Sequence, residues 1–328
     1  MRNLNKRKLL TLGLACFGAS CWLALHISGA SKLYAASNEP LRAVFASSTQ
    51  ADVFWAEPTD IAARDLFLGA GGKNGAPNLS NRFVEVRVSG GASGERVVEE
   101  VGAGRRWSLN TGPEAKAEVA ASRLVWAVGY QVDQNYFARE LQVANGGRTR
   151  LLKNVRLKRM SANVSPLGTW QWRSNPFVGT RQLQGLKVMM ALLSNGDLRD
   201  ENNRVVRLID VNQRVFYVGN IKSTLGKTAR LSGTAGNPSD YQNQKFIDKV
   251  RSGIVDFHNK GENSGVLDGV TVAEAQWMGE ILGHLSDAQL DQAFRAGGFE
   301  SAEVLSYRGA IKRRISELGQ LSSTRNGK

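Results

Sequence analysis

The sequence predicts an α+β fold in which a β-rich part with a single helix precedes a mostly helical part. Short runs between Arg82 and Leu157 alternate apolar and polar residues, which is the period of half-buried strands. After residue 240, apolar residues instead recur at helical spacing. We expect the border near residues 155–160. The chain has 328 residues, of which 42% are apolar and 22% charged, so it can bury a sizeable core.

The first 36 residues have the layout of a secretory signal or an N-terminal anchor. They hold five basic residues and no acid, and an apolar run extends from Leu9 to Ile27. Cleavage could follow Ala30 or Ala36, while an uncleaved run is long enough to span a bilayer. We therefore expect export to the periplasm or the extracellular space, or anchoring to the inner membrane by residues 9–27. Membrane contact is expected only through this segment.

The charge of the remaining chain narrows its partners. Because five of the 43 basic residues precede Ser37, residues 37–328 carry a net charge of +9 against the 29 acids. The basic residues are spread out and form no array interleaved with aromatic residues, so nucleic acid is not an expected partner. A phosphorylated or otherwise anionic ligand, or a partner protein, fits this charge better.

Cysteine and histidine chemistry is nearly absent from the expected folded part. Cys16 and Cys21 both lie in the export segment, which excludes thiol catalysis, cysteine-zinc sites and disulfides from residues 37–328. Only His258 and His284 remain there, so a Ser-His-Asp triad has few ways to form.

The β-rich part begins with three strands, expected at Arg82–Val88, Arg96–Val101 and Arg106–Leu109. The glycine-rich segment Ser89–Gly94 joins the first two. It suits either a plain hairpin turn or a loop that covers a phosphate group, and both readings stay open.

A helix is expected from Pro113 to Val128. Proline stands in its first turn, Glu114 lies near its start and Gly129 follows its end. One apolar stripe should pack on the sheet, with Glu118 beside that stripe. Further strands are expected at Glu140–Val143 and Arg150–Leu157.

The helical part opens with an aromatic loop, Gly168–Phe177. Its residues Trp170 and Trp172 favour buried packing where the two parts meet, with an aromatic platform for a sugar or base as the alternative. The remaining elements follow in order: a helix at Arg181–Ser194, strands at Asn203–Leu208 and Gln213–Val218, helices at Tyr241–Ser252 and Val272–Leu285, a helix that begins after Ser286 and ends at Gly297-Gly298, and a helix at Ser301–Leu318. Residues 321–328 are expected to be a disordered tail.

The stretch Asp197–Asn202, DLRDEN, follows the helix at Arg181–Ser194 and precedes a pair of strands. It resembles the DLKPEN form of the catalytic loop of protein kinases, including the step of five residues from Asp197 to Asn202. In that loop the aspartate orients the attacking hydroxyl and accepts its proton, and the asparagine binds the second magnesium ion. A solvated acidic turn is the alternative interpretation.

Longer segments resemble a family of uncharacterised bacterial proteins that is similar to atypical kinases of the secretory-pathway, lipid-kinase and HipA toxin types. These segments are WSLNTGPEAKAEVAASRLVWAVGY, GTWQWRSNPFVGTRQLQGLKVMMALL, DLRDENN and the helix after Asp268-Gly269-Val270-Thr271, and the resemblance covers about residues 50–318. It implies a two-lobed protein-kinase-like fold, with an N-lobe at 37–157 and a helical C-lobe at 158–320. It also implies ATP with Mg²⁺ or Mn²⁺ as ligands.

The resemblance assigns roles to individual residues. Glu118 corresponds to the helix glutamate that pairs with a phosphate-binding lysine. Asp197 corresponds to the catalytic aspartate and Asn202 to the metal-binding asparagine, with Asp200 or Asn203 as helpers.

Two positions depart from the kinase pattern. Asn110 stands where the related pattern Trp-x-Val-Lys-x-Gly has its lysine, and Asn220 stands where Ser-Asp-Leu-Gly has its metal-binding aspartate. Lys222 or Lys227 could supply a substitute charge. The nearby Gly226-Lys227-Thr228 lacks the earlier glycine of a phosphate-binding loop, because Ile221 occupies that position.

The sequence therefore favours an exported pseudokinase that binds a nucleotide, a phosphorylated ligand or a partner protein. One alternative is an active atypical kinase that uses Asp197, Asn202 and substitute lysines. Another is an interaction protein of the cell envelope whose loop has no ligand.

Overall fold

The computed structural model describes residues 52–86, 96–229 and 231–322. The export segment, the glycine-rich segment Ser89–Gly94 and the last six residues lie outside these ranges, so the predictions for them stay predictions. Within the described ranges, no helix combines the length and apolarity that crossing a membrane requires.

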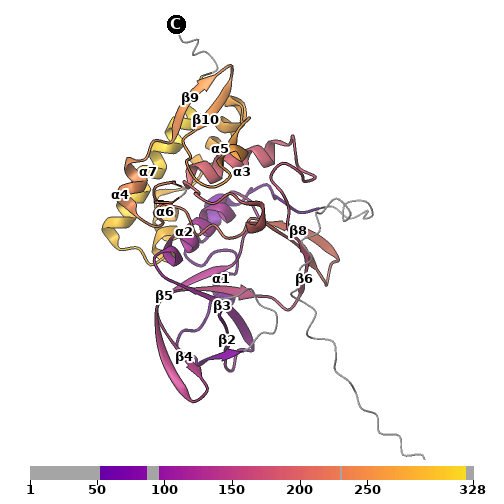
Figure 1. Cartoon of the computed structure of the whole chain (residues 1–328), viewed down its shortest axis with the longest axis vertical. Helices are drawn as coiled ribbons and strands as arrows, with labels where there is room; N and C mark the ends of the chain where they lie inside the picture. The colour runs from indigo at the N-terminus through magenta and orange to yellow at the C-terminus, as the bar shows by residue number, and fades with distance from the viewer. Residues whose placement is uncertain (1–51, 87–95, 230, 323–328) are drawn as a thin grey trace, which may run out of the picture.

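The chain has the mixed α+β architecture that the sequence predicts. Figure 1 shows a small β-barrel at one end of the molecule and a group of helices at the other, with helix α2 (Glu114–Ala127) between them. The two ends have separate hydrophobic cores, and the larger core continues from the helices into α2.

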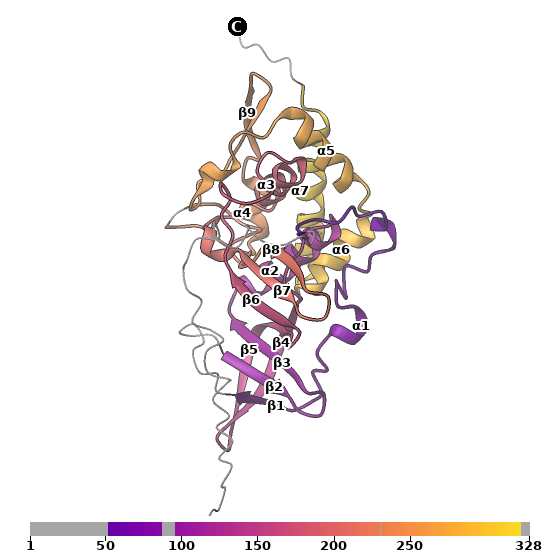
Figure 2. The same ribbon diagram turned by 90° about the vertical axis from the view of Figure 1, so that its right-hand side faces the viewer.

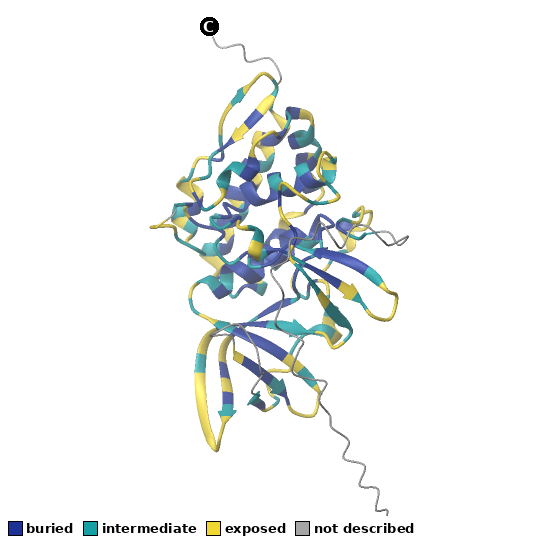
Figure 3. Cartoon of the chain, turned by 45° about the vertical axis from the view of Figure 1, so that its right-hand side comes forward, coloured by how far each residue is buried: buried dark blue, intermediate teal, exposed yellow. Residues whose placement is uncertain are grey.

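The barrel has the strand order β1-β2-β3-β5-β4 and closes through a parallel pairing of β1 with β4. Its strands are β1 (Phe83–Val86), β2 (Arg96–Glu100), β3 (Arg105–Thr111), β4 (Asn135–Asn145) and β5 (Arg148–Met160). Alternate residues point inward, and Trp107 lies fully buried among them. β4 and β5 are longer than predicted: β4 already begins at the buried Asn135, and the tip of the hairpin, which is exposed on both faces, carries no apolar alternation (Figure 3).

Helix α2 is buried on nearly all sides, not on a single stripe. It packs on β4 and β5 of the barrel and on α6 (Asp287–Ala296) of the helical part. Its alanines permit these close contacts, and the carbonyl of Lys116 comes so near Gly297 that a Cβ there would lie 2.6 Å from it. Glu118 is consequently 3% exposed, which the prediction of a single stripe did not anticipate.

A three-stranded antiparallel sheet lies between the barrel and the helices (Figure 2). It contains β6 (Val164–Gly168), β7 (Arg204–Leu208) and β8 (Gln213–Tyr217). The β7–β8 hairpin was predicted. β6 was not, because it contains Pro166 and a bulge just after it, and both interrupt the alternation that identifies a strand.

The helical part contains α3 (Arg181–Leu192), α5 (Val272–Gly283), α6 and α7 (Ser301–Gly319), with the short α4 (Pro238–Asn243). A further short helix, α1 (Gly72–Gly75), lies against the barrel. Capping side chains fix helix starts: Thr180 at α3, Asn237 at α4, Thr271 at α5 and Ser286 at α6. After α7, the carbonyl of Leu321 accepts a hydrogen bond from Gln276, 2.9 Å away.

The predicted helix at Tyr241–Ser252 is wrong. The helix α4 ends at Asn243, and a hairpin of β9 (Ile247–Arg251) and β10 (Ile254–Phe257) follows. Ser252 and Gly253 have φ angles of +49° and +75°, which suit the tight turn of a two-residue hairpin. The Ser-Gly pair was the sequence signal for this turn, and it outweighs the weak helical spacing around it.

Candidate functional site

The loop after α3 is held in place by a second segment of the chain. Asp197 lies beside Glu262 in a short parallel pairing, and the amide of Leu198 donates to the carbonyl of Glu262. Gly261 approaches so closely that a Cβ there would lie 2.3 Å from the carbonyl oxygen of Gly196. Asn263 donates to the carbonyl of Leu198. These contacts define the loop's path, which differs from that of a freely solvated turn.

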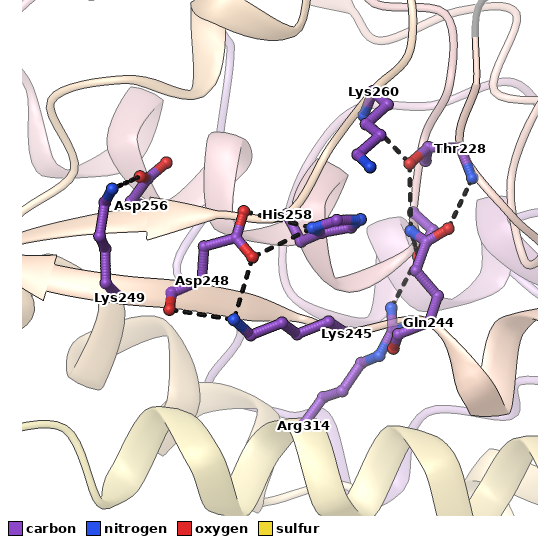
Figure 4. Close-up of polar contacts among 10 residues, drawn as sticks. Thr228, Gln244, Lys245, Asp248, Lys249, Asp256, His258, Lys260 and Arg314 are labelled. Carbon is purple, nitrogen blue, oxygen red and sulfur yellow. Dashed lines mark hydrogen bonds and ion pairs between the residues drawn. The ribbon is translucent and has the colours of Figure 1, made fainter.

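Side chains of α7 and of the segment after α4 also fix the start of this loop; Figure 4 shows two of them, Arg314 and Gln244, with Gln244 hydrogen-bonded to Thr228. The guanidinium of Arg314 donates to the carbonyl of Leu192 (2.7 Å) and to the Ser194 hydroxyl (2.8 Å), and it stacks on the Tyr241 ring. Gln244 donates to the hydroxyls of Ser194 and Thr228. α7 and the α4 region therefore set where Asp197 begins its loop.

The carboxylate of Asp197 is occupied by a neighbouring arginine. Arg199 donates Nε to Oδ1 (2.7 Å) and Nη2 to Oδ2 (2.8 Å), and the Asp197 side chain is 13% exposed. Burial alone would raise the pKa of Asp197, but the hydrogen bonds and charge of Arg199 outweigh it and hold that pKa below its ordinary value. A carboxylate in this state is a weak general base.

The structure brings Asp197, Asn202 and Asn220 into direct contact. The Asn202 amide donates to the carbonyl of Asp197 (3.0 Å), and the Asn220 amide donates to Oδ1 of Asn202 (2.7 Å). Asn220 adopts a left-handed backbone (φ +49°). A Cβ on Gly219 would lie 2.4 Å from the Asn202 carbonyl oxygen, so this packing requires glycine there.

These residues do not form a strong metal site. Two neutral amides, Asn202 and Asn220, stand at the positions that the sequence resemblance assigns to metal binding, and Oδ1 of Asn202 already accepts a hydrogen bond. Among the residues that the structure describes, no group of three or more His, Cys, Asp or Glu side chains could hold a metal ion. Mg²⁺ prefers carboxylate oxygens, so the side chains at this position do not fit a tightly held divalent cation.

Glu118 pairs with an arginine of β5. Nε of Arg156 lies 3.0 Å from Oε2 of Glu118, and Nη1 donates to the Ser108 carbonyl. Both charged side chains are buried, with Arg156 6% and Glu118 3% exposed. Burial raises the pKa of Glu118, while the charge of Arg156 opposes that rise.

Arg156 lies directly opposite Asn110 in the pairing of β3 with β5. Directly opposite residues project from the same face of a sheet, so Arg156 is a cation immediately beside Asn110, the position to which the sequence resemblance assigns a lysine. The sequence analysis missed this residue. Its signal was a charged residue between the apolar Val155 and Leu157, on a strand otherwise expected to be buried.

Asp133 joins the Glu118 side of the site to the Asp197 side. Asp133 is hydrogen-bonded to Arg204, the first residue of β7 after the loop. The preceding residue, Val132, pairs with Val218, which follows β8. Burial would raise the pKa of Asp133, but Arg204, with Lys158 and Arg156 of the barrel, lowers it. Asp133 is therefore influenced by cations from the barrel and by Arg204, which follows the loop.

Asn135 is a second polar residue that the sequence analysis missed. It lies opposite Lys158 in the pairing of β4 with β5 and is 1% exposed. Within the described part of the chain, neither its side-chain nitrogen nor its side-chain oxygen has a hydrogen-bond partner. Buried amides are normally satisfied, so Asn135 is a candidate for ligand contact.

The two candidate substitute lysines, Lys222 and Lys227, have different surroundings. Nζ of Lys222 pairs with Glu114 in the first turn of α2, at 3.2 Å, and both side chains are partly exposed. Lys227 is exposed, and its backbone amide donates to Thr234. No helix begins at Gly226, as a phosphate-binding loop requires; the next described helix is α4 at Pro238.

The remaining predicted residues have structural contacts. Trp170 and Trp172 are 0% and 3% exposed and pack against each other in the core, which agrees with the packing interpretation. The carboxylate of Asp200 accepts from the Trp172 amide, and Asn203 donates to the Trp170 carbonyl. These two proposed helpers therefore support the aromatic loop.

Comparisons with known proteins give little further identification. No family model matches the chain, and no curated protein matches it significantly. Among solved structures, the chain is similar to the Helicobacter pylori proinflammatory kinase CtkA, with 10% identity, a TM-score of 0.45, and coverage of 73% of this chain and 94% of that one. A likeness of this degree does not establish a family.

Proposed function

We propose that this protein is an exported pseudokinase, which binds a nucleotide, a phosphorylated ligand or a partner protein without efficient phosphoryl transfer. The observation that carries the proposal is the hydrogen bond between Asn202 and Asn220, the two residues that the sequence resemblance assigns to metal binding in a kinase. Kinases need a carboxylate there to neutralise phosphate charge through magnesium. Two hydrogen-bonded amides cannot supply that charge.

The state of Asp197 supports the same proposal. A catalytic aspartate must accept the proton of the attacking hydroxyl, so at least one of its oxygens must be open to the substrate. Arg199 occupies both oxygens and lowers the pKa of the carboxyl. The lost metal ligand and the occupied base would each reduce the rate by about a hundredfold or more.

A phosphate-binding role is supported by the cations beside the site. Arg156 and Lys158 of β5 and Arg204 of β7 lie around the acids Glu118 and Asp133. Arginine presents planar donors that match phosphate oxygens, and this does not require a metal ion. ATP is the first ligand to test, with Mg²⁺ or Mn²⁺ as an addition rather than a requirement.

The experiment combines a thermal-shift assay with an isotope-transfer assay on residues 37–328. ATP is added alone and with Mg²⁺ or Mn²⁺, to the wild type and to Asp197→Ala. We expect ATP to raise the unfolding midpoint in both proteins, with no transfer of labelled phosphate.

Two results would contradict the proposal. Transfer that Asp197→Ala abolishes would show an active atypical kinase. No shift with ATP or with a phosphorylated peptide would favour an envelope interaction protein without such a ligand. Localisation is tested separately, by fractionating cells that express the full chain.

A further inference from the structure

A cluster of arginines lies at one end of the barrel, on the inside and away from the site above. Arg105 of β3 and Arg159 of β5 both lie over the Trp107 ring, with their Cζ atoms 5.8 and 5.3 Å from its centre. Arg123 of α2 lies over the neighbouring Tyr136 ring, 5.1 Å from its centre. The two rings are themselves in contact, at 5.7 Å. Three guanidinium groups thus converge on one aromatic pair.

Within the described part of the chain, each member of this cluster has one unsatisfied buried polar atom, although Arg105 also donates to the carbonyls of Asn74 and Ala76 and to Glu100. Among the described residues, four buried atoms have no hydrogen-bond partner: Nε of Arg105, Nε of Arg123, Nη1 of Arg159 and the hydroxyl of Tyr136. Arg123 is 3% exposed and Tyr136 is 6% exposed. Buried charged donors without acceptors are strongly unfavourable, so their convergence points to an acceptor that belongs with them.

Glu100 is the carboxylate that pairs with Arg105, and its hydrogen bonds come from other groups than Arg123 and Arg159. It is fully buried and accepts from Arg105, from the Trp107 indole, from the amide of Asn78 and from the side chain of Asn81. Its Oε1 accepts three of these bonds and its Oε2 accepts the bond from Trp107.

Charge and access favour a small oxyanion. The charged groups that act on these side chains are three arginines against Glu100 and Asp65, which leaves an excess of one positive charge. Burial lowers the pKa of Arg123 to about 10, so it is still protonated at neutral pH. Arg105 and Arg159 are partly exposed and connect the buried donors with the surface.

We propose that this end of the barrel binds a small tetrahedral oxyanion, phosphate or sulfate, through Arg123, Arg159 and the Tyr136 hydroxyl, with Arg105 as the outer ligand. Guanidinium groups and phenol donors together match the oxygens of such an anion. Gly71 and Gly75 lie close to the Tyr136 hydroxyl, since a Cβ on either would come within 2.2 or 2.7 Å of it. We therefore expect an anion that carries a bulky substituent to fit this place poorly. The site is independent of the proposed nucleotide site, which lies on the outer face of the same strands.

The test uses the full chain, with inorganic phosphate, sulfate and O-phosphoserine as probes in calorimetry and thermal unfolding. We expect phosphate and sulfate to bind, and phosphoserine to bind at least tenfold more weakly. At a hundredfold excess over Kd, phosphate should raise the unfolding midpoint by about 5 °C. Tyr136→Phe and Arg159→Met should each weaken phosphate binding about tenfold or more, whereas Arg150→Met, on the exposed part of β5, should not.

Arg123→Met separates binding from a purely structural role. Without phosphate this variant should unfold at a higher temperature than the wild type, because it removes a buried charge that has no acceptor. With phosphate the order should reverse, because only the wild type is stabilised. Phosphate that binds equally well to the three cluster variants would overturn the proposal, and so would the absence of any shift with phosphate and sulfate, which would show that the donors are satisfied by water.

Discussion

At the scale of single residues, the ion pair of Asp197 with Arg199 decides what the loop can do. The aspartate is the residue most like a catalytic group in the sequence, but its charge is directed to a neighbour two positions away. The same residue type in the same motif therefore has a different chemical state from the one that the motif implies.

Replacement of Arg199 should reveal this pair through its pH dependence. The pKa of Asp197 is lowered in the folded protein, so the pair contributes stability above about pH 4 and loses it as the pH falls through the folded pKa. Arg199→Met should therefore reduce the free energy of unfolding by about 0.5–1 kcal/mol at pH 7 and by less at pH 3. Urea denaturation at both pH values measures this, and NMR titration should show a raised Asp197 pKa.

The control for that variant is Arg207→Met. Arg207 is an exposed arginine of β7 that donates a hydrogen bond to the neutral side chain of Asn212. It should show no difference between the two pH values. An equal loss of stability by both variants at pH 7 and at pH 3 would mean that the Asp197 pair is not formed in solution.

The buried pair of Arg156 with Glu118 should be far more sensitive. Arg156→Met leaves a buried carboxylate without its partner and should lower the free energy of unfolding by about 3–5 kcal/mol at pH 7. The double variant Glu118→Leu with Arg156→Met should recover most of that loss, because no charge then remains buried. Chemical denaturation of the two single variants and the double variant measures the coupling, and additive effects would contradict the pairing.

At the scale of elements, the loop depends on close backbone contacts that no side-chain pattern indicates. Gly219→Ala should lower the free energy of unfolding by about 2 kcal/mol, because its Cβ would meet the Asn202 carbonyl, which is backbone and cannot move aside. Gly196→Ala, just before Asp197, should change the free energy of unfolding by less than about 0.5 kcal/mol. The nearest atom to its new Cβ would be the Ser223 carbonyl oxygen, at 3.6 Å. Thermal and urea unfolding compare the two, and equal losses would show that the Asn202 contact is absent.

The elements also show what the sequence could and could not predict. The β7–β8 hairpin and the helices with capping residues were predictable, because alternation, helical period and caps are local signals. The β9–β10 hairpin depended on a two-residue turn at Ser252-Gly253, which was overlooked. β6 and the exposed end of β5 carry no alternation, so only their pairing with neighbouring strands defines them.

The candidate site was predictable only where its residues are close in sequence. Asp197 and Asn202 belong to one motif, and Asn220 follows the predicted hairpin, so their contact could be anticipated. Arg156, Asp133 and Asn135 join the site through the closure of the barrel, which brings distant strands together. Long-range pairing of this kind leaves no local pattern in the sequence.

At the scale of the whole molecule, α2 connects the barrel with the helical part. Its Glu118 contacts the barrel through Arg156, and its Glu114 contacts the segment after Asn220 through Lys222. Movement of the helix would therefore change both the charges at Arg156 and the position of Asn220.

The measurement that tests the account most directly is Mn²⁺ binding, by electron paramagnetic resonance in the presence of ATP, to the wild type, Asn220→Asp and Asn212→Asp. Asn212 and Asn220 have nearly the same left-handed backbone, with φ angles of +47° and +49°, so the two variants add the same charge to matched positions. If Asn220 occupies a kinase-like metal position that has lost its carboxylate, Asn220→Asp should bind Mn²⁺ at least tenfold more tightly than the wild type, and Asn212→Asp should not differ from it. Equal Mn²⁺ affinity in all three proteins would contradict the account.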